Sequence, residues 1–241
     1  MGRLGGPARG KSLRWRIVGP LFELLYRNRA LYWLASTIPF AGQWRTWQRL
    51  ALARLRGHEV LEIGCGIGTL LVDMLQAGYS CAAVDRSTQM VAATQGLLHR
   101  RRFPRELVQQ ADVRHLPFPD ARFDSVVSTF PTDYIADLTA LREIARVLRP
   151  GGRLIVVMGA SLLPANALLI PFVAIHRLMY GASGSEEPLP ETETGVGADT
   201  REDAFAALLR RAGLVPRAEA VRGPFWMAHL YLGEKSVDTA A

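Results

Sequence analysis

The fold is decided by the stretch Val60-Leu61-Glu62-Ile63-Gly64-Cys65-Gly66-Ile67-Gly68. Its first residues form a short buried strand, and its last residues form a glycine loop that opens a helix. Glycines at alternate positions leave no Cβ between the backbone and a ligand. The loop amides and the helix N-terminus then offer hydrogen-bond donors. The stretch therefore predicts a small-molecule site at the end of a buried strand.

The spacing of these glycines differs from the dinucleotide-binding fingerprint G-x-G-x-x-G, whose third glycine comes one residue later. Glu62 differs as well, because a carboxylate before the first glycine suits an ammonium group of the ligand better than a pyrophosphate. Both features disfavour a nicotinamide-dependent reductase, which remains an alternative on a related sheet.

Strands and helices alternate along the rest of the chain. We expect strands at 58–63, 79–84, 106–111, 123–128 and 153–158, a closing pair at 214–221 and 225–232, and helices at 69–77, 88–100, 136–148 and 199–212. This alternation predicts an α/β fold: a doubly wound, mainly parallel seven-stranded sheet with an antiparallel C-terminal strand and helices on both faces.

Two more carboxylates follow predicted strands. Asp85 ends the second strand, where a carboxylate can accept the hydroxyls of a ribose. Asp112 ends the third strand, where a polar side chain can meet an adenine edge. The alternative is that both residues only cap the helices or turns that follow.

Taken together, these pieces resemble the class I S-adenosylmethionine-dependent methyltransferases. They are similar to the small-molecule branch that includes quinone and phospholipid methyltransferases. The resemblance covers about residues 57–158 and rests on the glycine loop, Asp85-Arg86-Ser87 with Met90, Ala111-Asp112-Val113 with Leu116-Pro117-Phe118, Phe123–Val127, Leu141–Glu143 and Arg146–Leu154.

The resemblance implies S-adenosyl-L-methionine as the cofactor and assigns roles to individual positions. The methionine part would lie against Gly64, Gly66 and Gly68, with Glu62 holding its amino group. Cys65 of the same loop is either a contact or a small packing residue. The remaining roles are the ribose hydroxyls for Asp85, the sides of the adenine for Arg86 and Met90, the adenine edge for Asp112 and the Val113 amide, and the path to the sulfonium for Ser128 and Thr129.

A general base is needed only if the acceptor must lose a proton during in-line methyl transfer. The segment 129–134, after the fourth strand, offers Asp133 and Tyr134 as candidate bases, although Asp133 could equally cap the next helix. The segment lacks the Asn/Asp-Pro-Pro-aromatic signature of enzymes that methylate base nitrogens or glutamine side chains. The catalytic residues therefore stay open, and such acceptors are disfavoured.

Composition bounds the protein class. The chain has 241 residues, 49% hydrophobic and 21% charged, which is ordinary globular composition. Cys65 and Cys81 are the only cysteines, so the sequence predicts neither a disulfide framework nor a metal site. The net charge of +7 is uneven, because residues 1–56 hold eleven basic residues and one acid.

The chain divides into two parts. Residues 1–56 form a basic, aromatic-rich helical segment, and residues 57–241 form a Rossmann-like domain with an apolar insert and acidic loop at 161–198. Residues 154–175 carry no charge and are long enough to span a membrane. Asn166 and Pro171 weaken that interpretation, so we expect a strand followed by an apolar helix over 161–175.

These observations predict a methyltransferase for a small, lipophilic acceptor. The resemblance implies that residues 1–56 and the insert after the fifth strand build the substrate site. Residues 1–56 would also either contact an anionic membrane surface or only cap the sheet edge and the cofactor. The alternative function is a non-catalytic protein of the same fold that binds a membrane or RNA, although nucleic acid is not an expected partner. We expect a cytoplasmic location, with or without membrane association, and the sequence does not specify an oligomeric state.

Overall fold

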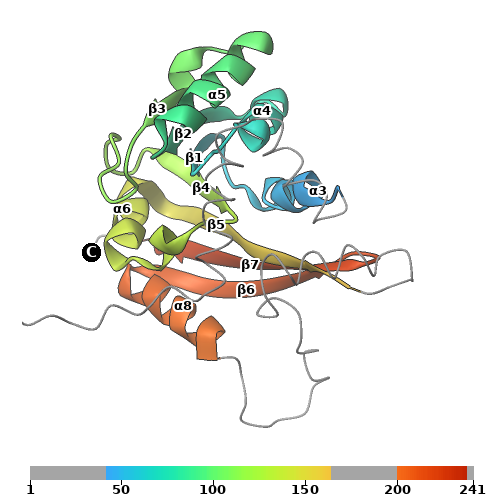
Figure 1. Cartoon of the computed structure of the whole chain (residues 1–241). Coiled ribbons are helices and arrows are strands. Elements are labelled where there is room, and N and C mark those ends of the chain that lie inside the picture. Colours follow the sequence, from blue (N-terminus) through green and yellow to red (C-terminus); the bar gives the residue numbers. More distant parts are fainter. Residues whose placement is uncertain (1–41, 164–199, 238–241) are drawn as a thin grey trace, which may run out of the picture.

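The computed structural model describes residues 42–163 and 200–237 (Figure 1). Expectations that concern residues 1–41 and 164–199 lie outside this part of the chain. They include most of the basic segment and most of the apolar insert. The described residues form a seven-stranded sheet with the order β3-β2-β1-β4-β5-β7-β6.

The sheet is mostly parallel, as predicted. Its parallel part contains β1 (Glu59–Ile63), β2 (Ser80–Asp85), β3 (Val108–Gln110), β4 (Phe123–Thr129) and β5 (Leu148–Leu162). The last strand of the chain, β7 (Trp226–Lys235), is antiparallel to both of its neighbours, β5 and β6 (Leu214–Arg222). This arrangement confirms the predicted fold class.

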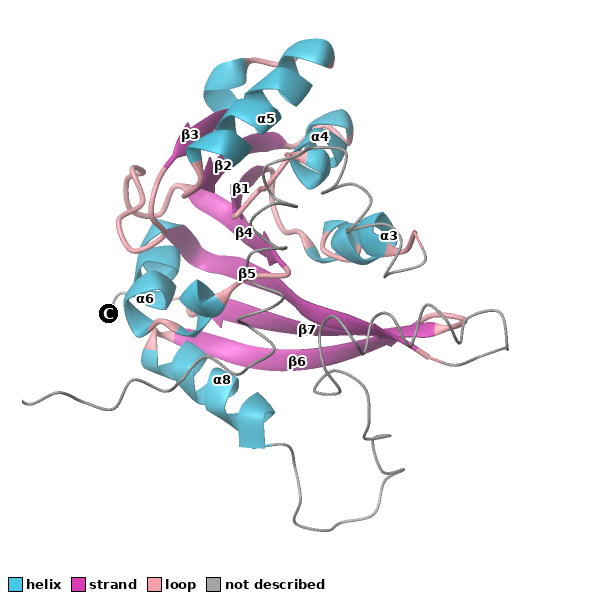
Figure 2. Ribbon diagram, in the orientation of Figure 1, coloured by secondary structure: helices cyan, strands magenta, loops and turns pink. Residues whose placement is uncertain are grey.

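Helices cover both faces of the sheet (Figure 2). One apolar cluster packs under α3 (Trp44–Arg49), α4 (Thr69–Gln76) and α5 (Thr88–Arg100), and the other packs under α6 (Leu138–Val147) and α8 (Thr200–Arg211). Successive strand residues alternate between the clusters, with Val60 in the first and Leu61 in the second. Short 3₁₀ turns are η1 (Leu52–Arg54), η2 (Arg105–Leu107) and η3 (Asp133–Ala136).

Local chemistry explains where helices begin. Ser87 directly precedes the helix predicted at 88–100, and its side chain caps α5 by accepting a hydrogen bond from the Met90 N–H at 3.4 Å. Asp137 caps α6 by accepting from the Thr139 N–H at 2.8 Å, so this helix begins later than predicted. The third strand is shorter than predicted because residues 105–107 form η2.

Strand β5 corrects two boundaries. The Pro150-Gly151-Gly152 turn lies inside the strand, where the register with β4 shifts, rather than before it. The strand also continues to Leu162, which pairs with Trp226 of β7. An insert starting at residue 161 and a helix from 161 are therefore wrong at 161–162, because both residues belong to the sheet.

The strand order fixes where a ligand can bind. β1 lies between β2 and β4, so the chain direction across the sheet reverses beside it. In open α/β sheets, ligands bind at this switch point, outside the carboxyl ends of the strands. Residues that directly follow β1, β2, β3 and β4 therefore meet at one edge.

Candidate active site

The glycine loop joins β1 to α4 at the carboxyl edge of the sheet. The Gly64 N–H donates to the Val84 carbonyl at 2.8 Å, which ties the loop to β2. Gly64 has φ +69°, and a Cβ at this position would lie 2.7 Å from the Tyr134 hydroxyl. Gly68 has φ +77° and is the N-cap of α4. Both positions therefore require glycine.

Asp85 holds two backbone segments together at the end of β2. Its Oδ2 accepts from the Gly66 N–H at 2.9 Å, and its Oδ1 accepts from the Ser87 N–H at 2.8 Å. Each carboxylate oxygen keeps further acceptor capacity for a ligand hydroxyl. Asp85 therefore both fixes the glycine loop and offers an acceptor to the cavity.

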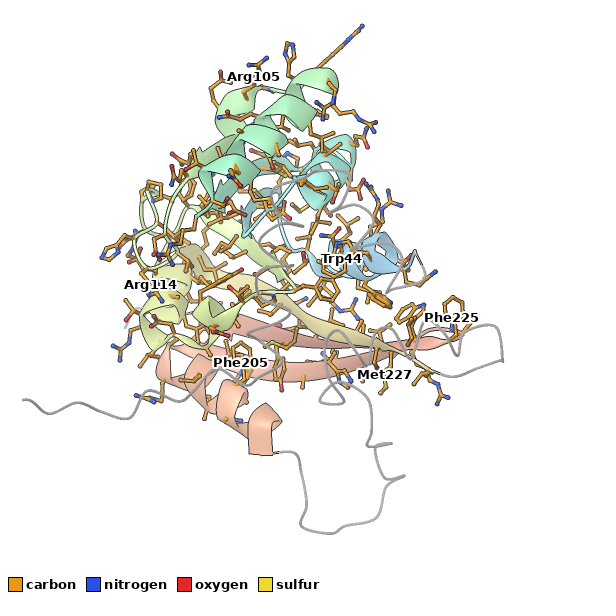
Figure 3. All side chains as sticks on the ribbon, viewed as in Figure 1. Trp44, Arg105, Arg114, Phe205, Phe225 and Met227 are labelled. Carbon is orange, nitrogen blue, oxygen red and sulfur yellow. The ribbon has the colours of Figure 1, made fainter. Side chains whose placement is uncertain are left out.

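Asp112 forms an ion pair with Arg114, which Figure 3 labels beside α6. Its Oδ1 accepts from the Arg114 N–H at 2.9 Å, and the Arg114 guanidinium lies 3.2 Å from Oδ2. Nε of the same guanidinium donates to Asp137 at 2.6 Å. The backbone hydrogen bond, which outweighs partial desolvation, and the charge of Arg114 hold the pKa of Asp112 below its usual value. Asp112 is therefore ionised at neutral pH.

Glu62 is a buried carboxylate near the end of β1, and its contact with the amino group of the cofactor stays a prediction. The residue is 1% exposed, and it does not line the cavity. Burial raises its pKa to about 8, the charges of Asp85 and Asp73 add to the rise, and a backbone hydrogen bond from Leu71 opposes it. Among the described residues, its Oε2 has no hydrogen-bond partner.

Tyr134, in the segment after β4, connects that segment to β4 and β1 through its hydroxyl. Its hydroxyl lies 2.7 Å from Ser128 Oγ and 3.4 Å from the Ile63 carbonyl. Burial raises the pKa of Tyr134 to about 12 against the effect of the Ser128 hydrogen bond. The phenol is protonated at neutral pH, which disfavours it as a general base. Asp133 is exposed at the start of η3.

Helix α3, which lies in the segment 1–56 expected at the substrate site, supplies a wall of the cavity with residues that the sequence did not single out. Trp44 stacks on Phe130 with ring centroids 4.1 Å apart and planes at 23° (Figure 3 labels Trp44). Gln48 accepts from the Thr69 hydroxyl at 3.2 Å and donates to the Thr129 hydroxyl at 3.4 Å. The helix thereby reaches both the start of α4 and the end of β4.

One cavity of about 940 Å³ joins these elements. Its lining includes most of the predicted site residues: Gly64, Cys65, Gly66, Asp85, Arg86, Met90, Asp112, Val113, Thr129, Asp133 and Tyr134. Glu62, Gly68 and Ser128 are buried and lie outside the lining. Burial raises the pKa of the Cys65 thiol, which agrees with a packing role rather than a nucleophilic one.

Sequence reasoning missed several lining residues. They are Trp44, Arg45 and Gln48 on α3, Thr69, Ser87, Gln89, Arg114, and the segment Phe130–Thr132. The available signal was the i, i+4 spacing of Trp44 and Gln48, which puts both side chains on one side of the helix. Trp47 of the same helix is buried in the core.

Within residues 42–163 and 200–237, no group of three His, Cys, Asp or Glu side chains is placed to hold a metal ion. No helix in the described ranges has the length and apolar character needed to cross a bilayer.

The sheet order and the loop-and-carboxylate site define a class I methyltransferase fold. A family described as "Methyltransferase domain" matches residues 61–156. A demethylmenaquinone methyltransferase of Mycobacterium marinum is 32% identical over 208 residues, covering 82% of this chain and 85% of that protein. The counterpart of Mycobacterium tuberculosis H37Rv is 36% identical over 208 residues, covering 82% and 84%. The chain therefore belongs to the class I S-adenosylmethionine-dependent methyltransferase family.

Solved structures agree on the fold. A putative S-adenosylmethionine-dependent methyltransferase of Methanococcus maripaludis aligns with a TM-score of 0.59 at 17% identity, covering 98% of this chain and 100% of that one. A geranyl diphosphate methyltransferase solved with its substrate and sinefungin aligns with a TM-score of 0.55 at 14% identity, covering 79% and 77%.

The protein is thus a methyltransferase whose cofactor is S-adenosylmethionine. The residues present fit that cofactor, because one cavity holds the glycine loop and, at neighbouring strand ends, the carboxylates Asp85 and Asp112. A loop glycine with positive φ brings bare backbone to the cavity surface at Gly64.

Proposed function

We propose that the enzyme transfers a methyl group in line to a small, lipophilic acceptor that enters beside α3. The observation that carries the proposal is the two-sided cavity. One side is polar, with the glycine loop, Asp85 and Asp112, and the other carries the stacked rings of Trp44 and Phe130. A polar side suits an amino-acid nucleoside, and an aromatic side suits an apolar acceptor.

The chain's own work is to hold and align. In the proposal, Gly64 and Gly66 receive the methionine part, Asp85 the ribose, and Asp112 with Val113 the adenine. When bound, S-adenosylmethionine supplies a methyl group already activated on a sulfonium, so alignment and exclusion of water remain for the protein. Asp85 contributes twice, because the carboxylate that meets the ribose also fixes Gly66.

Asp133 is the remaining candidate for a base. It lines the cavity rim, and an acceptor hydroxyl would lose its proton there when its oxygen or ring carbon takes the methyl group. Tyr134 instead positions the loop through Ser128 and Ile63. An Asp133→Asn variant should then lower kcat while leaving cofactor affinity unchanged.

The acceptor class is supported by the relatives. The similar proteins named above are demethylmenaquinone methyltransferases, which act on a quinone-type ring. We propose a ring of this kind, carrying an apolar substituent, as the acceptor here.

Calorimetric titration with S-adenosylhomocysteine tests the cofactor half. Wild-type protein should bind with micromolar affinity, and Asp85→Ala should weaken binding at least tenfold. Asp120→Ala is the matched control, because that carboxylate is exposed, outside the cavity, and pairs with Arg146. Absence of binding by folded wild-type protein would overturn the proposal and leave a non-catalytic protein of this fold.

Membrane contact is proposed for residues 1–41 alone. The arginines in the rest of the basic segment form intramolecular ion pairs. Arg45 and Arg49 pair with Asp73, Arg54 pairs with Glu219, and Arg56 pairs with Glu234. Flotation with vesicles of anionic lipid should carry the full chain but not a variant lacking residues 1–30. Flotation that is equal for both, or absent for both, would contradict this proposal.

A further inference from the structure

Phe130 holds an unusual backbone conformation at the cavity. It directly follows β4 and has φ +50°, a left-handed value that bulky side chains rarely adopt. Its N–H donates to the Val157 carbonyl at 2.8 Å, so the sheet holds the strained residue in place. Such strain is characteristic of functional sites, where the surrounding structure imposes it.

The two other non-glycine residues with positive φ in the described chain lie elsewhere. Arg102 and Ala121 are exposed and do not line the cavity. Phe130 differs from both, because its strained backbone presents a half-buried ring to the site. Position 130 therefore carries an aromatic side chain although a glycine would adopt this backbone conformation without strain.

The ring partner of Phe130 is fixed just as firmly. Trp44 lies on α3, and Trp47 of the same helix is fully buried. The ring centroid of Trp47 lies 6.2 Å from that of Phe130 and 6.2 Å from that of Trp226. Arg45 and Arg49 of the same helix bind Asp73 of α4 at 2.6 and 2.8 Å. The stacked pair is thus anchored from α3, the loop after β4, and β7.

Gln48 places a carboxamide between this pair and the cofactor side. It touches the Thr69 and Thr129 hydroxyls and lines the cavity with Trp44. A carboxamide both donates and accepts, so it can recognise a hydroxyl or a carbonyl on a ring. The aromatic faces add stacking, which favours flat partners over saturated ones.

We propose that Trp44, Phe130 and Gln48 determine which acceptor the enzyme accepts, by receiving the flat, oxygen-bearing ring of the proposed function. The ring stacks on the Trp44–Phe130 wall, and its oxygen bonds to Gln48. The inference rests on the proposed function and deepens it, because it assigns ring recognition to three residues outside the cofactor half. The strained Phe130 backbone is the cost of holding this wall.

The test compares a flat probe with its saturated counterpart. Full-length protein with saturating S-adenosylhomocysteine is titrated with 1-naphthol and with decahydro-1-naphthol in the calorimeter. Wild-type protein should bind 1-naphthol at least tenfold more tightly. Phe130→Leu, Trp44→Leu and Gln48→Leu should each weaken 1-naphthol binding at least fivefold, while S-adenosylhomocysteine affinity stays within about twofold.

Phe225→Leu is the matched control, because Phe225 packs against the same apolar cluster but does not line the cavity. It should leave 1-naphthol binding unchanged, and Phe130→Tyr should retain it. Equal binding of the two probes, or equal 1-naphthol affinity in wild-type protein and the three variants, would overturn the inference. Absence of S-adenosylhomocysteine binding by wild-type protein would instead overturn the proposed function. Titration with 1-naphthol alone would then still test whether Trp44, Phe130 and Gln48 bind a flat ring.

Discussion

Replacing Glu62 with Gln should make the protein more stable at alkaline pH. Glu62 is 1% exposed, and its pKa is raised to about 8, first by burial and then by the charges of Asp85 and Asp73. Above that pH the folded state must carry a buried carboxylate that the unfolded chain leaves in water. Glutamine keeps the shape of the protonated acid and removes this cost.

The magnitude follows from proton linkage. Below the ordinary pKa of 4.5, Glu62 is protonated in both states and the group has no pH effect. Between 4.5 and about 8 only the unfolded chain ionises, so stability falls by about 1.4 kcal/mol per pH unit. The full loss is about 5 kcal/mol, a large share of the 5–15 kcal/mol of a typical domain.

Urea denaturation followed by circular dichroism, from pH 5 to pH 9, measures the effect. The free energies of unfolding of wild-type protein and Glu62→Gln should differ by less than about 1 kcal/mol at pH 5 and separate as pH rises, with the variant more stable. Glu143→Gln is the control, because the hydrogen bond from Arg146, against partial desolvation, lowers the pKa of Glu143. Protonation of Glu143 therefore changes the free energy of unfolding only below about pH 5. Parallel curves for wild-type protein and Glu62→Gln would refute the reasoning.

Three further substitutions test other parts of the structure. Gly64→Ala should weaken S-adenosylhomocysteine binding at least tenfold in calorimetry, because φ is +69° and the new Cβ would meet the Tyr134 hydroxyl at 2.7 Å; unchanged affinity would show that the loop is not rigid. Trp47→Ala should lower the free energy of unfolding by about 3–5 kcal/mol in urea, because the side chain is fully buried; a loss under about 1 kcal/mol would contradict its anchoring role. Asp124→Ala should cost about 2–3 kcal/mol, because the His58 and Glu59 N–H groups at the start of β1 lose their acceptor and Arg149 loses its ion pair, while the Arg149 Nε keeps the Ala121 carbonyl. Despite desolvation, these hydrogen bonds hold the pKa of Asp124 below its ordinary value, so the difference from wild type should shrink only as pH falls below about 4.

The parallel part of the fold could be predicted because its determinants are local. A few neighbouring residues are enough to recognise the strand at Val60–Ile63, the glycine loop and the Ser87 cap. The errors arose where pairing decides the structure. β5 runs through a proline and two glycines to Leu162 because β4 and β7 supply its partners, which no local pattern reveals.

The candidate site divides in the same way. Asp85 and Asp112 could be placed because the carboxyl ends of parallel strands must meet at one edge. The burial of Glu62 could not be predicted, because it depends on how α4, whose Leu71 bonds to it, packs against β1. The pocket wall on α3 could not be placed, since Trp44 meets Phe130 only after Trp47 has packed into the core.

This division has a consequence for how the enzyme can change. The cofactor half is tied to strand ends and to glycines that tolerate no side chain, so substitutions there disturb the fold and the cofactor together. The aromatic half depends on one short helix that is held by Trp47 and by two arginines on Asp73. Exchanges at Trp44 and Gln48 leave those anchors untouched. Under the proposed function, acceptor preference can therefore change at the cavity-lining residues of α3 while cofactor binding and the sheet stay as they are.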